Sequence, residues 1–309
     1  MLAASAGIAL AARDTLSLRI VRRQLNVERM PAELDGLRVL HVSDVHAGFG
    51  PGLSLLGRVI KLAEREHPDL IVVTGDLVTR HRASRRATGL LDRLADEASC
   101  GAFAVLGNHD VGHANDPFAQ GWDPVLERLV LLDGTSAAVV IRGVRVAVAG
   151  VSAKAYLAGV TAAQLVPPPP APPVDLSLLL CHFPAVAGRL PANAADVVFC
   201  GHLHGGQICL PWPGGRVSLA HPRQGNGPAV SVRDGIVTYI SGGIGTTFVP
   251  MRFLARAEVS LLTLVSPRNP PSVASETTDL GSRDLAGALP TRSNELSSLD
   301  ARAASDGGD

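Results

Sequence analysis

Cys200-Gly201-His202-Leu203-His204-Gly205-Gly206-Gln207 is the stretch that decides the fold of this 309-residue chain. It overlaps the short apolar run Val197-Val198-Phe199-Cys200, whose β-branched and aromatic residues predict a buried strand ended by glycine. The glycines of the turn let the backbone approach a ligand or a metal closely. His202 and His204 can therefore leave the end of one strand and point into one pocket. Alone, the His-x-His turn is a weak indication, because a loop with two solvated imidazoles has the same pattern.

Four other apolar runs end in residue types that bind metals. Each run is followed by carboxylate, imidazole or amide side chains: Asp44-Val45-His46, Gly75-Asp76, Gly107-Asn108-His109-Asp110 and His182-Phe183-Pro184. In open α/β sheets, ligands bind outside the carboxyl ends of the strands. Five strands that deliver such side chains at that end therefore predict a single site.

The five blocks, in this order, resemble those of the calcineurin-like metallophosphoesterases, and the resemblance runs from about Leu37 to Leu264. The Gly-His-x-His-Gly-Gly-Gln form of the last block is similar to the branch that contains bacterial phosphodiesterases, which are often tied to the membrane. Ser241-Gly242-Gly243-Ile244-Gly245 and Pro250-Met251-Arg252 are also similar to that branch. The resemblance implies an α/β fold, the calcineurin-like four-layer sandwich with two mixed β-sheets flanked by helices.

The resemblance also implies a centre for two divalent metal ions. The first ion would be bound by Asp44, His46, Asp76 and His204, and the second by Asp76, Asn108, His182 and His202. Asp76 would bridge the two ions. Oxygen and nitrogen ligands of this kind suit Mn²⁺, Fe or Zn²⁺. A hydroxide held between the ions would be the nucleophile, so that no Ser or Cys nucleophile is required.

His109 and Asp110 are the candidate catalytic residues. By resemblance, His109 is not a ligand, and it would protonate the leaving oxygen or stabilise charge on the phosphoryl group. Asp110 could hold that imidazole in one tautomer. Relatives often carry Asp where this chain has Thr79, which bears on substrate preference more than on metal binding. Arg252 is open between a phosphate contact and a structural salt bridge.

The leading functional hypothesis is metal-dependent hydrolysis of a small phosphodiester or nucleotide-linked substrate. The alternative enzyme is a pyrophosphatase that acts on a nucleotide-linked lipid or sugar. The third hypothesis, from another class, is a non-catalytic metal-binding scaffold that uses the proline-rich segment 167–173 and the C-terminal tail for interactions. Degenerate members of such families lose ligands, whereas every ligand position is filled here, which favours an enzyme.

Composition supports a globular enzyme, with 46% hydrophobic residues and a formal net charge of zero. A nucleic-acid partner is disfavoured, because there is no basic excess and aromatic residues make up only 4% of the chain. The four cysteines show no paired spacing typical of structural zinc sites. We therefore expect core cysteines and a cytoplasmic, reducing compartment, while the oligomeric state stays open.

Three segments are predicted along the chain. Residues 1–33 form an N-terminal leader that is too short to span a bilayer, which takes about 20 apolar residues. It is interpreted as a docked or frayed helix, or as the remnant of a membrane anchor that would allow peripheral membrane association. Residues 34–265 form the catalytic domain, and residues 266–309, which lack aromatic residues, form a disordered tail.

Two local predictions can be checked directly against the structure. Asp123 as N-cap and Pro124 at the first helical position predict a helix to about Leu131. The alternating stretch 137–149, with Arg142-Gly143 at its middle, predicts a β-hairpin.

Overall fold

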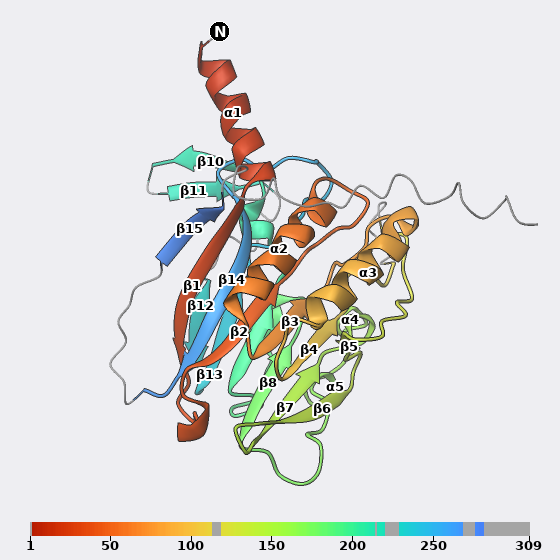
Figure 1. The fold of residues 1–309 in the computed structure, drawn as a ribbon, viewed down its shortest axis with the longest axis vertical. Coiled ribbons are helices and arrows are strands. Elements are labelled where there is room, and N and C mark those ends of the chain that lie inside the picture. Colours follow the sequence, from red (N-terminus) through yellow and green to blue (C-terminus); the bar gives the residue numbers. More distant parts are fainter. Residues whose placement is uncertain (1, 113–118, 214, 220–228, 268–275, 281–309) are drawn as a thin grey trace, which may run out of the picture.

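Two mixed β-sheets packed face to face form the body of the protein (Figure 1). The computed structural model describes residues 2–112, 119–213, 215–219, 229–267 and 276–280. In order across the first sheet, the strands are β15 (Glu276–Leu280), β1 (Leu18–Asn26), β14 (Ala257–Val265), β2 (Leu37–Val42), β3 (Leu70–Thr74), β4 (Gly101–Val105) and β5 (Val130–Leu131). Across the second they are β12 (Val230–Arg233), β13 (Ile236–Ile240), β9 (Val197–Cys200), β8 (Leu176–Leu180), β7 (Val144–Gly150) and β6 (Ser136–Ile141).

The strands that lead into the sequence blocks are parallel within each sheet. Strands β2, β3 and β4 pair in parallel in the first sheet, and β8 and β9 do so in the second. Their side chains are buried on both faces, which is why these runs are apolar throughout instead of alternating. For example, Val39 of β2 faces the core between the sheets, whereas Leu40 joins the cluster that contains α2.

Helices cover the outer faces and complete four layers. Helices α2 (Gly52–Glu66) and α3 (Ser84–Ala95) lie over the first sheet (Figure 1). Leu55, Val59 and Leu91 on these helices are buried against it. The short helices α4 (Ala153–Leu157) and α5 (Ala162–Leu165) belong to the second sheet's side. The predicted fold class, with two mixed sheets and flanking helices, is confirmed. The predicted hairpin is also present, because β6 pairs antiparallel with β7.

Part of the predicted N-terminal leader, residues 1–33, is a strand of the first sheet. Strand β1 pairs in parallel with β14 along its whole length, from Leu18 opposite Ala257 to Asn26 opposite Val265. Leu18 and Ile20 are fully buried in this sheet. The sequence analysis did not predict this strand, because Arg19, Arg22 and Arg23 interrupt its apolar residues without a regular alternation.

Helix α1 (Leu2–Leu16) precedes this strand and projects from the body (Figure 1). At 15 residues it is about 22 Å long, shorter than the hydrocarbon core of a bilayer, about 30 Å. Among the residues that the structure describes, no helix is long and apolar enough to cross a membrane.

The predicted helix from Asp123 to Leu131 is wrong. The backbone amides of Glu127, Arg128 and Leu129 donate to the Asp92 carboxylate of α3, at 3.1, 2.9 and 3.2 Å. The chain then continues as the edge strand β5 beside β4. A carboxylate from a distant part of the sequence thus takes the amides that a local helix would have used.

Within the predicted C-terminal tail, residues 276–280 form strand β15. Strand β15 pairs antiparallel with β1, from Leu280 opposite Leu18 to Glu276 opposite Arg22. The tail residues 268–275 and 281–309 lie outside the described residues.

We expect truncation after Pro267, which removes β15, to lower the melting temperature by a few degrees. Loss of 1 kcal/mol of unfolding free energy lowers the melting temperature by about 2–4 °C for a chain of this size. The value of kcat should stay unchanged, because β15 lies three strands away from β2 in the sheet order. Truncation after Leu280 is the matched control and should melt like the full chain. A large fall in kcat with the first truncation would show that the edge strand supports the site.

Candidate metal centre

Five strand ends from both sheets meet at one place. The carboxyl ends of β2, β3 and β4 deliver Asp44, His46, Asp76 and Asn108 from the first sheet, and those of β8 and β9 deliver His182, His202 and His204 from the second. The structure therefore brings together all seven residues that the sequence proposed as metal ligands. They come from two sheets, so the site lies where the ends of the two layers converge.

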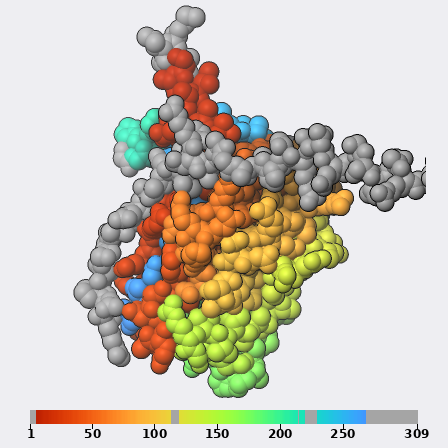
Figure 2. Space-filling view, viewed as in Figure 1, coloured from red at the N-terminus to blue at the C-terminus, as the bar shows by residue number. Residues whose placement is uncertain are grey.

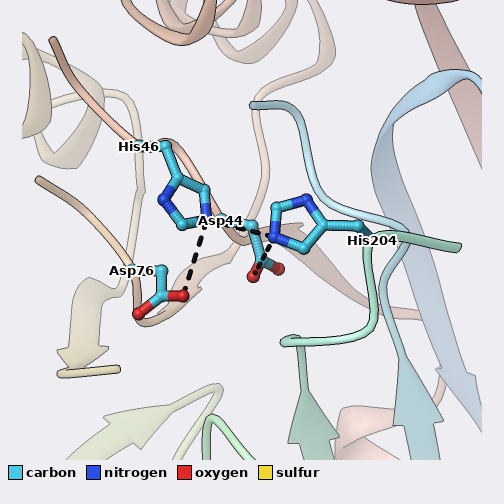
Figure 3. Close-up of side chains that lie close together, drawn as sticks. All are labelled: Asp44, His46, Asp76 and His204. Carbon is cyan, nitrogen blue, oxygen red and sulfur yellow. Dashed lines mark hydrogen bonds and ion pairs between the residues drawn. The ribbon is translucent and has the colours of Figure 1, made fainter. Parts of the chain in front are cut away.

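The first group of potential ligands is fully buried (Figure 3). One ligand atom from each of its members lies within 4.8 Å of those of the others: Asp44, His46, Asp76 and His204. His204 Nε2 lies 3.0 Å from His46 Nε2 and 3.4 Å from an oxygen of Asp44. His46 Nε2 lies 3.5 Å from Asp76 Oδ2. Two ring nitrogens and two carboxylates thus converge on one point.

The second group shares Asp76 with the first. Asp76, His182 and His202 also place ligand atoms within 4.8 Å of one another. His182 Nε2 lies 3.3 Å from Asp76 Oδ2 and 3.1 Å from His202 Nδ1. The side-chain oxygen of Asn108 lies 3.2 Å from the same His182 nitrogen. Asp76 is therefore the carboxylate common to both groups.

Hydrogen bonds on the far side of two rings orient them toward the site. The Nδ1–H of His182 donates to the backbone oxygen of Thr74 at 2.8 Å. Because a carbonyl only accepts, Nδ1 carries a proton, and Nε2 is the ring nitrogen that faces Asp76. His46 Nδ1 lies 2.8 Å from the hydroxyl of Thr79 in the same manner. Such outer hydrogen bonds fix the tautomer of metal-binding histidines.

At neutral pH the site contains two ionised, buried carboxylates, Asp44 and Asp76. Burial raises the pKa of Asp44 to about 6 and lowers that of His46 to about 3, so at neutral pH the first is ionised and the second is neutral. Burial would also raise the pKa of Asp76, but His182 and His109 outweigh it and hold that pKa well below its usual value. Although burial opposes it, Asp76 raises the pKa of His182 to about 9. A proton on His182 thus offsets one of the two negative charges that bound cations would neutralise.

The backbone at the site is strained. Asp44, His46, Asp76, His202 and His204 all have positive φ, between 48° and 74°. Residues other than glycine in this region cost about 1–3 kcal/mol each and cluster at functional sites. Neighbouring glycines allow the close approach: a Cβ on Gly107 would lie 2.1 Å from Asp76 Oδ1, and one on Gly201 would lie 2.7 Å from Asp44 Oδ2.

His109 lies beside the first group and belongs to neither group of ligand atoms. Its side chain is 2% exposed, and its ring meets that of His46 edge to face, with the centroids 4.5 Å apart. Its Nε2 lies 3.2 Å from the hydroxyl of Thr247. Its backbone amide donates to Asp76 Oδ1 at 2.9 Å, so residue 109 also holds the shared carboxylate.

The role predicted for Asp110, as holder of the His109 imidazole, is not the role that its hydrogen bonds indicate. Its carboxylate accepts the backbone amides of Leu77, Val78 and Gly107, at 2.9 to 3.0 Å. Asp110 is completely buried, and burial raises its pKa to about 6. It therefore clamps the loop that carries Asp76 to the loop that carries Asn108, and we assign it a positioning role.

Three residues that support the site were missed or left open from the sequence. Thr247 contacts His109, and the Gln207 side chain bonds to the backbone of Thr247 at 2.7 and 2.9 Å. Arg252, which the sequence left open between a phosphate contact and a structural salt bridge, is fully buried. Its guanidinium donates to the backbone oxygens of Gly245 and His204, at 2.8 and 3.0 Å, and lies 3.3 Å from His204 Nδ1. Only Gln207 stood inside a sequence block.

The residues fit a pair of divalent cations. Oxygen and nitrogen donors converge in two sets joined by one carboxylate, and the neighbouring cysteines, Cys181 and Cys200, are absent from both sets. This donor chemistry suits Mn²⁺, Fe or Zn²⁺ and does not select among them.

Comparison with known proteins agrees with this geometry. The family model described as calcineurin-like phosphoesterase matches residues 37–206, which is more than half of the chain. The match covers all five blocks that carry the ligands.

Relatives are similar over most of the chain at low identity. "Transmembrane protein with metallophosphoesterase domain" of Danio rerio is 27% identical over 80% of this chain, which spans 57% of that protein's length. "UDP-2,3-diacylglucosamine pyrophosphatase LpxG" of Chlamydia trachomatis is 25% identical over 79% of this chain and 88% of its own. "Phosphodiesterase YaeI" of Escherichia coli is 28% identical over 74% of this chain and 82% of its own.

Proposed function

Because this chain belongs to the calcineurin-like phosphoesterase family, we propose that it is a metal-dependent phosphodiesterase with two divalent cations. The observation that carries the proposal is the position of Asp76, whose carboxylate is common to both groups of ligand atoms. A scaffold without activity would not need to keep both groups complete around a shared carboxylate in a strained, buried backbone.

The residues divide into three roles. Asp44, His46, Asp76, Asn108, His182, His202 and His204 would hold the cations. Two divalent cations would act as Lewis acids on a phosphoryl group. They would also lower the pKa of water toward 7, so that hydroxide is available at neutral pH. His109 would donate a proton to the leaving oxygen, since its ring lies against His46 while Thr247 orients it.

The charge around the site favours diesters over monoesters. A monoester dianion carries two charges and benefits from added cationic side chains. No Arg or Lys lies inside any of the five blocks, and the guanidinium of Arg252 is buried and bonded to carbonyl oxygens. A diester carries one charge and a second substituent, which the glycines around the last block leave room for.

We therefore expect bis(nitrophenyl) phosphate to be hydrolysed with a higher kcat/KM than nitrophenyl phosphate when Mn²⁺ is supplied. The two substrates share a leaving group, so their ratio reports the preference for ester class. Repeating the assay with Zn²⁺ and Fe²⁺, together with metal analysis of the purified protein, identifies the cations. A clear preference for the monoester would overturn the proposed substrate class and leave the metal centre intact.

A pyrophosphatase that acts on a nucleotide-linked lipid or sugar is the second candidate. One observation favours it: the Phe248 ring is 53% exposed and lies 6.2 Å from the His109 ring, which puts an apolar side chain on the proposed leaving-group side. The relative from Chlamydia trachomatis carries that activity in its name. Activity on a nucleotide sugar that exceeds activity on simple diesters would decide for this candidate.

A further inference from the structure

Exposed apolar side chains are gathered in one part of the molecule. Among the residues that the structure describes, thirteen large apolar side chains are exposed, and nine of them lie in three segments. These nine are Ile8 and Leu16 of α1; Leu210, Trp212, Val217 and Leu219 of the hairpin of β10 (Cys209–Trp212) and β11 (Gly215–Ser218) with the residue after it; and Phe248, Val249 and Met251 of the loop between β13 and β14. We call these nine side chains the apolar rim. The other four exposed side chains are all valines elsewhere in the chain.

Hydrogen bonds join the three segments into one unit. The Asp14 carboxylate at the end of α1 accepts the amide of Leu254 at 2.8 Å, and the Thr15 hydroxyl accepts the amide of Arg252 at 2.7 Å. A β-bridge connects Ile208, at the start of the hairpin, to Phe253. Figures 1 and 2 show α1 and the hairpin at the same end of the molecule. The three segments that carry the rim are therefore neighbours at one end of the molecule.

The loop in the rim is held in a conformation that presents its apolar side chains outward. Phe248 has a φ of 56° and is 53% exposed. The Gln207 side chain holds both neighbours, because its Nε2 donates to the oxygens of Thr247 and Val249, at 2.7 and 2.9 Å. Hydrogen bonds on both sides of Phe248 thus stabilise the strained backbone that leaves this ring exposed.

The charge of the three segments is positive. Together, residues 5–16, 208–219 and 246–256 contain four arginines and one acidic residue, Asp14. Asp14 is 1% exposed and caps the Leu254 amide, and Arg252 is fully buried. Arg13, Arg216 and Arg256 lie near the rim. Arg13 is paired with Asp14 at 3.1 Å, yet its side chain is 57% exposed. These three arginines line a hollow of about 190 Å³, together with Arg19 and the buried carboxylates of Asp14 and Glu258.

We propose that the apolar rim docks on the surface of an anionic lipid bilayer. Trp, Phe, Leu and Met beside arginines and without exposed acids are the chemistry that enters the headgroup region, with the apolar groups below and the cations among lipid phosphates. The rim is carried by a projecting helix, a hairpin and a loop. Such projections suit shallow insertion, whereas a second copy of the chain would need a continuous face of about 800 Å². Because Thr247 contacts His109, docking places the metal centre beside the bilayer.

The test is co-sedimentation of the full chain with two kinds of vesicle, phosphatidylcholine alone and phosphatidylcholine mixed with phosphatidylglycerol. We expect binding to the mixed vesicles that weakens as salt is added. The double variant Ile8→Ser/Trp212→Ser should bind about tenfold more weakly or worse, since two inserted apolar side chains are lost. Its matched control, Val140→Ser/Val232→Ser, removes two side chains of similar exposure outside the rim and should bind like the wild type.

Charge reversal tests the second half of the proposal. Arg13→Glu should weaken binding to the mixed vesicles about fivefold or more, while Arg85→Glu on α3, also exposed, should change it little. Unchanged melting temperatures would show that the variants are folded. The proposal is overturned by absence of binding to mixed vesicles, by equal losses in the rim variant and its valine control, or by a lipid-free dimer that only the rim variant abolishes.

Discussion

Asp76→Ala should release both metal ions and lower hydrolysis of bis(nitrophenyl) phosphate by at least about 10³-fold, more than the loss of one charge-stabilising group. The physical reason is that Asp76 Oδ2 lies 3.5 Å from His46 Nε2 and 3.3 Å from His182 Nε2, one nitrogen from each group. Without this carboxylate, each group loses an anionic ligand and the two groups lose their connection. Elemental analysis of the purified variant measures the metal content directly.

Asp44→Ala is the matched control for Asp76→Ala. Asp44 belongs to the first group and is absent from the second. This variant should therefore lose about one metal ion per chain, whereas Asp76→Ala loses both. Both carboxylates are buried, so a melting curve for each variant separates loss of metal from loss of fold. Two ions per chain retained by a folded Asp76→Ala protein would refute the bridging assignment.

His109→Ala should keep both metal ions and lower kcat by about 10²–10⁴-fold, the usual contribution of a general acid. His109 stands beside the first group, with its ring against His46 and its Nε2 on Thr247, and belongs to neither group of ligand atoms. The loss should be smaller for a diester with a nitrophenolate leaving group than for one with an alkoxide, because nitrophenolate leaves without a proton.

Thr247→Val separates positioning from proton donation. It removes the hydroxyl that lies 3.2 Å from His109 Nε2 but leaves the imidazole, so kcat should fall much less than in His109→Ala. Its metal content should match that of the wild type.

Equal losses in His109→Ala for good and poor leaving groups would be inconsistent with proton donation and would leave charge stabilisation as the role of this ring.

Local patterns carried much of the prediction. Each of the five blocks is an apolar run followed within a few residues by its ligand types, and both the strand and the ligands are local properties of the chain. Because parallel strands are buried on both faces, they appear in the sequence as continuous apolar runs and can be predicted without knowing which strand pairs with them. The fold class and the seven residues that meet at the site followed from these blocks and from the family resemblance. The hairpin of β6 and β7 was predicted for the same local reason.

Tertiary structure decided the features that depend on residues far apart in the sequence. Strand β1 pairs with β14, more than 230 residues away in the chain, and its own irregular mixture of arginine and apolar residues did not predict a strand. The helix predicted from Asp123 failed because Asp92 binds its amides. The side chains of Asp110 and Arg252 likewise form hydrogen bonds with backbone groups of other loops. The sequence by itself determined which side chains end each strand, whereas their partners were decided by packing, because hydrogen bonds in a buried site form between groups that only the folded chain brings within reach.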